Sequence, residues 1–83
     1  MDSTIPGFDR ITMSPGKLGG KPCIRGLRIS VADVMRALAG YPSQSELLAD
    51  YPDLEPEDLQ QAAAFATAML DWNHLQETAL PVR

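Results

Sequence analysis

The chain has 83 residues, a mass of 9.0 kDa and a formal net charge of −4, and 45% of its residues are hydrophobic. This length suits one domain, so we expect a single domain over 1–83 with an extended arm over 1–30 and a helical region over 31–80. The composition argues against disorder and against collagen-like or coiled-coil rods. A multidomain enzyme and a disulfide-stapled toxin are excluded by the length and by the presence of one cysteine, Cys23.

A chain of this size removes only roughly 60–65% of its unfolded surface from water on folding, so association with a partner would help its stability. The first residues lack the basic start and apolar run of a secretion signal. No apolar run approaches the ~18 residues that cross a membrane, and a lone thiol fits a reducing compartment. We expect a cytoplasmic protein with no membrane partner.

Charge is distributed unevenly between the two halves of the chain. Residues 1–40 hold six basic and three acidic side chains, which gives +3, whereas residues 41–83 hold one basic and eight acidic side chains, which gives −7. A basic half on an acidic chain is typical of a local polyanion-binding face. The alternative is a self-complementary protein whose two halves attract each other.

Glycine and proline make long helices improbable in the first thirty residues, where three short runs favour β-structure: Ile11–Met13, Pro22–Arg25 and Leu27–Ser30. Gly26 lies between the last two runs, so a tight turn there would make a hairpin. Period-two alternation points Ile24 and Ile29 inward. It points Lys21, Cys23, Arg25 and Arg28 outward, which predicts a basic β-ribbon.

Ser30 begins the helical signals as an N-cap, with Asp33 as its capping-box partner. The apolar residues that follow recur at i, i+3, i+4 and i+7 and predict one buried helix face: Val31, Val34, Met35 and Leu38. Gly40-Tyr41-Pro42 ends this helix.

Ser43 and Glu46 form the S-x-x-E capping box of a second, short helix that carries Leu47, Leu48 and Tyr51 and is stopped by Pro52. A third helix is predicted from Glu55-Pro56, because proline is favoured at the first helical position and carboxylates suit the positive end of the helix dipole. It continues to about Thr78.

This third helix is apolar on two sides. One stripe consists of Leu59, Ala62, Ala63, Ala66, Met69 and Leu70, and the opposite stripe consists of Phe65, Ala68, Trp72, Leu75 and Ala79. A helix with two apolar faces must be covered on both. The second stripe therefore predicts a contact with another copy or another protein, and the alternative is that the N-terminal arm folds over it.

Three short helices with a turn between the first two also suggest a helix-turn-helix module that reads DNA with its third helix. Glu55, Glu57 and Asp58 would then meet the phosphates at the start of the recognition helix, which is repulsive. The basic arm is the better candidate for DNA contacts, through Lys17, Lys21, Arg25, Arg28 and Arg36. The alternative is that Arg25 and Arg28 pair with the acidic half.

No enzyme signature is complete. The run from Gly16 to Pro22 has one residue too few for a P-loop and ends in proline where a Ser or Thr would hold magnesium. His74 lies three residues after Asp71 but has no nucleophile nearby. Cys23 and His74 are too few for a structural zinc site, and Cys23 is either a reactive thiol or a small buried strand residue. We expect no catalytic residues, no metal and no cofactor.

Two motifs carry a resemblance to a known family: Gly20-Lys21-Pro22-Cys23-Ile24-Arg25-Gly26-Leu27-Arg28-Ile29-Ser30-Val31, and Tyr51-Pro52-Asp53-Leu54-Glu55-Pro56-Glu57-Asp58-Leu59 before an alanine-rich helix. The chain resembles the bacterial domain-of-unknown-function 433 family of predicted VapB-like antitoxins, from about Arg10 to Met69. The resemblance implies a mainly α protein, with a three-helix homeodomain-like helix-turn-helix preceded by short strands. It also implies a PIN-like ribonuclease toxin as partner.

Three positions depart from the family pattern: Leu27 replaces a threonine, Tyr41 occupies the glycine position of the inter-helix turn, and Glu55 replaces the Thr or Ser cap of the last helix. Our first hypothesis is a dimeric antitoxin-type regulator that binds its toxin through the stripe containing Phe65, Trp72 and Leu75, and operator DNA through the basic arm. Our second hypothesis is a protein-interaction or oligomerisation module with no nucleic-acid function.

Overall fold

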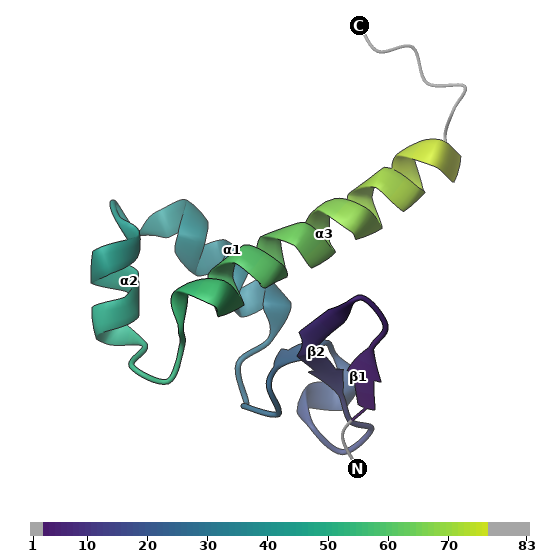
Figure 1. The fold of residues 1–83 in the computed structure, drawn as a ribbon, viewed down its shortest axis with the longest axis horizontal. Coiled ribbons are helices and arrows are strands. Elements are labelled where there is room, and N and C mark those ends of the chain that lie inside the picture. The colour runs from purple at the N-terminus through teal and green to yellow at the C-terminus, as the bar shows by residue number, and fades with distance from the viewer. Residues whose placement is uncertain (1–2, 77–83) are drawn as a thin grey trace, which may run out of the picture.

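The computed structural model describes the backbone of residues 3–76 and the side chains of residues 3–71. A three-stranded antiparallel sheet with strand order β1-β2-β3 lies beside three helices (Figure 1). In chain order the elements are β1 (Ser3–Ile5), β2 (Phe8–Met13), a 3-10 turn η1 (Leu18–Gly20), β3 (Cys23–Ile24), α1 (Val31–Gly40), α2 (Gln44–Asp50) and α3 (Pro56–Gln76).

This arrangement is α+β, so the predicted mainly α class is wrong. The sheet is larger than predicted because residues 3–13 form a complete hairpin. Only Ile11–Met13, the end of its second strand, was predicted to be β-structure. Pro6-Gly7 makes its turn, and Gly7 adopts a φ of 87° that glycine tolerates. Ser3 pairs with Met13 and Thr4 pairs with Thr12.

The predicted ribbon around Gly26 is present in a shorter form. Cys23 bridges Ser30, and the Ile24 N–H donates to the Ile29 carbonyl at 2.9 Å. Arg25 and Gly26 both have positive φ, 43° and 73°, as in the type I′ turns that join antiparallel strands.

Ile24 points into the core, as predicted, but the outward orientation predicted for Cys23 is wrong because its exposed fraction is 1%. Ile24 faces the helices. Cys23 is covered by the connection before β3, where its Sγ donates to the Lys21 carbonyl at 3.2 Å. Cys23 is therefore the small buried strand residue of the two alternatives.

Both short helices begin as predicted. Ser30 and Asp33 form a complete capping box at the start of α1, and the Ser43 hydroxyl accepts from the Glu46 N–H at the start of α2. The helices end at Gly40 and Asp50, next to the predicted breaks. α3 begins at Pro56 and its described part ends at Gln76, so its predicted start is confirmed.

The core lies between the sheet and the helices and collects residues from every part of the chain: Ile11, Ile24, Val31, Val34, Leu47, Leu54, Leu59, Ala62 and Phe65. The beginning of α1 lies opposite residues 65–70 of α3, and Leu38 near its end lies opposite Leu59 and Ala63. The two helices therefore run in opposite directions, and α3 continues past the start of α1, away from the rest of the molecule (Figure 1).

Candidate functional site

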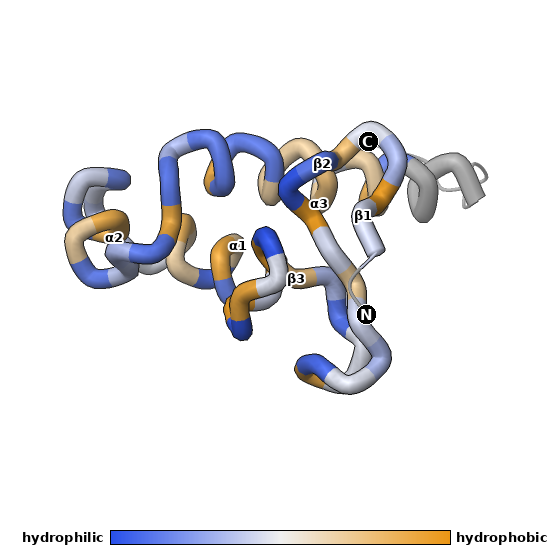
Figure 2. Tube along the Cα trace, turned by 60° about the horizontal axis from the view of Figure 1, so that its bottom comes forward, coloured by the Kyte–Doolittle hydropathy of each residue, from blue (hydrophilic) through white to orange (hydrophobic). Residues whose placement is uncertain are grey.

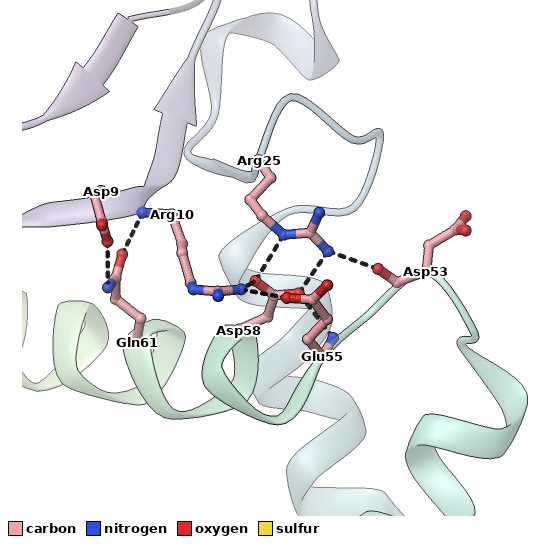
Figure 3. A network of polar contacts seen from close by, with 7 residues as sticks. All are labelled: Asp9, Arg10, Arg25, Asp53, Glu55, Asp58 and Gln61. Atoms are coloured by element: carbon pink, nitrogen blue, oxygen red, sulfur yellow. Dashed lines mark hydrogen bonds and ion pairs between the residues drawn. The ribbon is translucent and has the colours of Figure 1, made fainter.

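Asp58, in the first turn of α3, is a carboxylate with no exposed surface. Figure 3 shows it at the centre of a polar network between the sheet and the helix. Its Oδ2 accepts from the Glu55 backbone N–H at 2.8 Å, which is the reciprocal half of a capping box. Asp58 therefore supplies the half of the capping box that does not depend on a Ser or Thr at position 55.

Two arginines from the sheet region complete the coordination of Asp58. Arg25 Nε donates to Oδ1 at 2.9 Å and Arg25 Nη2 donates to Oδ2 at 2.8 Å, a bidentate pair. Arg10 Nη1 donates to Oδ1 of Asp58 and to Oε1 of Glu55, both at 2.8 Å. We call Arg10, Arg25, Glu55 and Asp58 the Asp58 clamp.

The backbone is arranged to aim these guanidinium groups. Arg10 lies in β2, directly before the buried Ile11. Arg25 adopts a left-handed φ of 43°, a conformation that costs a non-glycine residue about 1 kcal/mol or more. Its N–H donates to the Arg10 carbonyl at 2.8 Å, and Nη2 also donates to the Asp53 carbonyl at 2.7 Å. The turn is held in this conformation by contacts of both the Arg25 backbone N–H and its guanidinium group.

The clamp shifts the pKa values of its members in the directions expected for ion pairs. Burial alone would raise the pKa of Asp58, but the hydrogen bonds from Arg25 and Arg10 outweigh it, and the pKa is lowered overall. Hydrogen bonds to Glu55 and Asp58 raise the pKa of Arg10, and the hydrogen bonds to Asp58 raise that of Arg25. All three groups are therefore charged at neutral pH.

A neighbouring contact extends the clamp along α3. Gln61, one turn after Asp58, accepts from the Arg10 N–H and donates to Asp9 Oδ1 at 2.9 Å. Every oxygen of Asp58 is already hydrogen-bonded, and the clamp contains no nucleophile, so it has no group left to act on a substrate. We assign it a structural role: it fixes the sheet to the start of α3.

The five predicted DNA-binding residues do not form one surface. Arg25 belongs to the clamp, and Lys17 Nζ donates to the Gly26 carbonyl. Arg36 pairs with Asp33 at 2.8 Å, one turn earlier on α1. Among the side chains of residues 3–71, the exposed Lys21 and Arg28 form no ion pair. The alternative in which Arg25 pairs with the acidic half is therefore the one observed, whereas Arg28 has no acidic partner among these side chains.

Neither apolar stripe of α3 keeps its expected role along its whole length. Phe65, assigned to the partner-binding stripe, is 7% exposed and contacts Phe8 of the N-terminal hairpin edge to face, with ring centroids 5.2 Å apart. Met69 and Leu70, assigned to the covered stripe, are 47% and 66% exposed. The first half of each stripe packs on the protein's own core because only that part of α3 lies beside the rest of the chain.

The remaining members of the predicted partner stripe lie further along α3. Ala68 is half-buried. Trp72 and Leu75 lie on the described helical backbone but beyond the described side chains, and Ala79 lies outside the described residues. Partner binding through these four positions stays a prediction.

The acidic half keeps most of its charge uncompensated. Glu55 and Asp58 pair with arginines, but within the described residues no salt bridge is recorded for the other carboxylates of the helical region. All of these are exposed: Glu46, Asp50, Asp53, Glu57 and Asp71. Asp50 accepts a hydrogen bond from the Tyr41 hydroxyl at 2.6 Å, which raises the pKa of Tyr41 to about 12. The stretch from α2 to the start of α3 therefore carries four exposed carboxylates, which we call the acidic face: Glu46, Asp50, Asp53 and Glu57.

Among the side chains of residues 3–71, no three His, Cys, Asp or Glu are placed to share a metal ion. In the same part of the chain, no helix combines the length and the apolar character needed to cross a bilayer. The side chain of His74 lies beyond those described.

The molecule is thus a small α+β protein whose sheet is fixed to a long helix by a buried ion-pair cluster. The chain belongs to the family described as "Protein of unknown function (DUF433)", whose sequence profile matches residues 11–66. That range contains the whole core and three of the four clamp residues, Arg10 lying directly before it, and it ends where α3 leaves the rest of the molecule.

A curated relative can be aligned with most of the chain. The "Uncharacterized protein y4eO" of Sinorhizobium fredii (strain NBRC 101917 / NGR234) is 34% identical over 68 residues, which are 82% of this chain and 31% of the relative. The chain therefore spans about a third of the length of this relative. No solved structure matches the chain.

Proposed function

We propose that this protein is an antitoxin-type component of a bacterial toxin–antitoxin pair that neutralises a PIN-like ribonuclease. The proposal rests on the acidic face defined above, whose carboxylates lack cationic partners in the described part of the chain. A ribonuclease must attract a polyanion, so its substrate groove is basic. A folded acidic surface of complementary shape would compete with RNA for that groove.

The resemblance to VapB-like antitoxins, carried by the motifs around Arg25 and Asp58, supports the same assignment. The clamp gives the acidic face a rigid base, because it fixes the start of α3 and the Asp53 carbonyl to the sheet. A rigid inhibitor loses less conformational entropy on binding than a flexible acidic segment.

The test is inhibition of RNA cleavage by a purified PIN-like ribonuclease from the same genome. We expect the wild-type chain to inhibit it, and the triple variant Glu46→Gln/Asp53→Asn/Glu57→Gln to need about tenfold more protein for the same inhibition at low salt. The difference should shrink at high salt, because exposed charges are screened.

The matched control is Lys21→Ala/Arg28→Ala, which changes two exposed charges of the basic arm and should leave inhibition unchanged. If the wild-type chain neither binds nor inhibits such ribonucleases, the antitoxin assignment is wrong. If the triple variant inhibits as well as wild type, the acidic face is not the inhibitory surface.

Operator DNA binding is a separate proposal, and Lys21, Arg28 and Arg36 are the residues that support it. Arg28 and Arg36 line one surface depression beside Tyr41 and Tyr51. Salt-dependent retardation of the upstream DNA that Lys21→Ala/Arg28→Ala weakens would support it. Arg25 is left out of this test, since its removal would break the clamp. A chain that binds no DNA and no ribonuclease would leave the interaction-module hypothesis.

A further inference from the structure

An apolar groove of about 380 Å³ opens where α3 leaves the rest of the molecule. One wall comes from the basic arm and the start of α1, and it includes Lys21, Pro22 and Met35. The other wall is α3 itself, with Met69 and Leu70. Figure 2 shows the neighbouring stretch of α3 in pale orange, in contrast to the mixed colours of α2.

The α3 wall of the groove continues the face that is buried earlier in the helix. Leu59 and Ala62 on that face are 2% and 0% exposed, whereas Met69 and Leu70 further along are 47% and 66% exposed. Exposing apolar surface costs about 25 cal/mol for each Å². The groove is therefore an extension of the core that the described part of the chain leaves uncovered.

We propose that a second copy of this chain occupies the groove. In a two-fold interface the same patch serves both partners, so it must contain a ridge and a matching hollow. This patch contains both: the projecting Leu70 ridge of α3, and the groove between α3 and Pro22. In the pair, the Leu70 ridge of each copy lies in the groove of the other.

The charges around the groove favour a copy of the same chain. Lys21 lies in the arm wall, and Asp71 directly follows Leu70 on the exposed flank of α3; both are exposed. When the ridge of one copy enters the groove of the other, Asp71 of each approaches Lys21 of the second. Opposite charges therefore meet twice, whereas a patch with charges of one sign would repel its own copy.

This inference goes beyond the proposed function and does not depend on it. The acidic residues Glu46, Asp53 and Glu57 belong to α2, the connection after it and the start of α3, at the other end of α3 from the groove. They stay exposed in the pair, so dimerisation and ribonuclease inhibition can be measured and lost independently.

The first test is the molar mass of the full chain in solution, by light scattering and sedimentation over a concentration series. We expect a dimer for the wild type and at least about tenfold weaker association for Leu70→Glu. The matched control Ala64→Glu adds the same charge at an exposed position of α3 outside the groove and should dimerise like the wild type. A wild-type chain that stays monomeric, or a Leu70→Glu variant that dimerises normally, overturns the proposal, as does equal loss in both variants.

The second test is charge exchange, and it needs no change to the apolar patch. Lys21→Glu and Asp71→Lys should each weaken self-association, and the double variant should restore it. An equimolar mixture of the two single variants should also associate more strongly than either variant alone. In the mixed pair, Asp71 of one copy meets Lys21 of the other, and the lysine introduced at position 71 meets the glutamate introduced at position 21, so both contacts join opposite charges. Failure of the double variant to recover, while the single variants are impaired and folded, would exclude the Lys21–Asp71 contact and with it the proposed pairing.

Discussion

The two halves of α3 have similar alanine-rich sequences and opposite surroundings. The first half, Pro56–Phe65, is fixed to the sheet by the Asp58 clamp and carries three core residues. The second half, from Ala66, carries the two most exposed large apolar side chains of the described structure, Met69 and Leu70. Helix propensity does not distinguish the halves. What distinguishes them is which part of the remaining chain lies beside each one.

The comparison shows how one helix can serve both stability and recognition. Its first half uses charge and apolar burial for contacts within the chain, so Asp58 and Phe65 are not open to a partner. Among the described residues its second half contains no fully buried side chain and no ion pair, so its apolar surface is open to one. The clamp makes this division possible, because a helix fixed firmly at one end can project at the other.

The largest expected difference between the halves comes from removing apolar side chains. Phe65→Ala deletes a ring that is 7% exposed and packed on Phe8, and we expect it to lower the free energy of unfolding by about 4 kcal/mol. Met69→Ala, one turn later, should change it by less than about 1 kcal/mol in the monomer. Urea unfolding at low protein concentration measures both. Equal losses would mean that the second half is also part of the core.

Removing a carboxylate should also lower the free energy of unfolding more in the first half than in the second, but by a smaller difference. Asp58→Ala leaves the guanidinium groups of Arg10 and Arg25 and the Glu55 N–H without their shared acceptor, and we expect a loss of about 3 kcal/mol. Asp71→Ala removes an exposed carboxylate with no recorded salt bridge in the described chain and should stay within about 0.5 kcal/mol of wild type. A similar result for both would show that the clamp contributes nothing net to stability.

The pH dependence of stability provides a test of the same cluster. The pKa of Asp58 is lowered from 3.8 in the folded chain, so the unfolded chain binds this proton more tightly. The stabilisation is therefore fully present above about pH 4 and is lost as the pH falls from there through the folded-state pKa. Asp33 contributes in the same direction, because hydrogen bonds from the Ser30 backbone and Arg36 lower its pKa.

We expect the free energy of unfolding of wild type to fall as the pH is lowered below about 4, and that of Asp58→Asn to fall less steeply. Asp33→Asn is the control for the second carboxylate. It should reduce the dependence of the unfolding free energy on pH by less than Asp58→Asn does, because Asp33 lies near the surface. Identical slopes for wild type and Asp58→Asn would contradict the lowered pKa of Asp58.

The helices could be predicted from the sequence because their signals are local. Ser30 with Asp33, Ser43 with Glu46, and Pro56 each act within one turn, so a window of a few residues contains the whole interaction. The class of the protein could not be predicted in the same way. The hairpin of residues 3–13 had one local signal, the turn sequence Ile5-Pro6-Gly7. Its strands are stable only when Ile11 and Phe8 pack on α3, which lies far away in the sequence.

The candidate site depends still more on distant parts of the chain. Asp58 lies 48 residues from Arg10 and 33 from Arg25 along the sequence. Because the helix dipole alone favours a carboxylate in the first turn of a helix, the presence of Asp58 there did not indicate arginine partners. The uneven charge of the two halves was the one available signal, and it left ion pairing and polyanion binding equally open. The stripes of α3 were identified correctly as apolar, but periodicity cannot show where along a helix its covering ends.

The smallest effect that we predict concerns the start of α1, which borders both the core and the groove. Ser30→Ala removes the hydroxyl that caps α1 from a residue that is 4% exposed and lines the groove, and we expect a loss of about 1 kcal/mol. Ser43→Ala at the exposed start of α2 should lose about 0.5 kcal/mol, because that cap faces water. If α1 serves only as a firm wall, Ser30→Ala should lower stability and leave self-association unchanged. Weaker self-association in this variant, measured where it is still fully folded, would mean that the start of α1 shifts when its cap is lost. The groove would then be less rigid than the first half of α3.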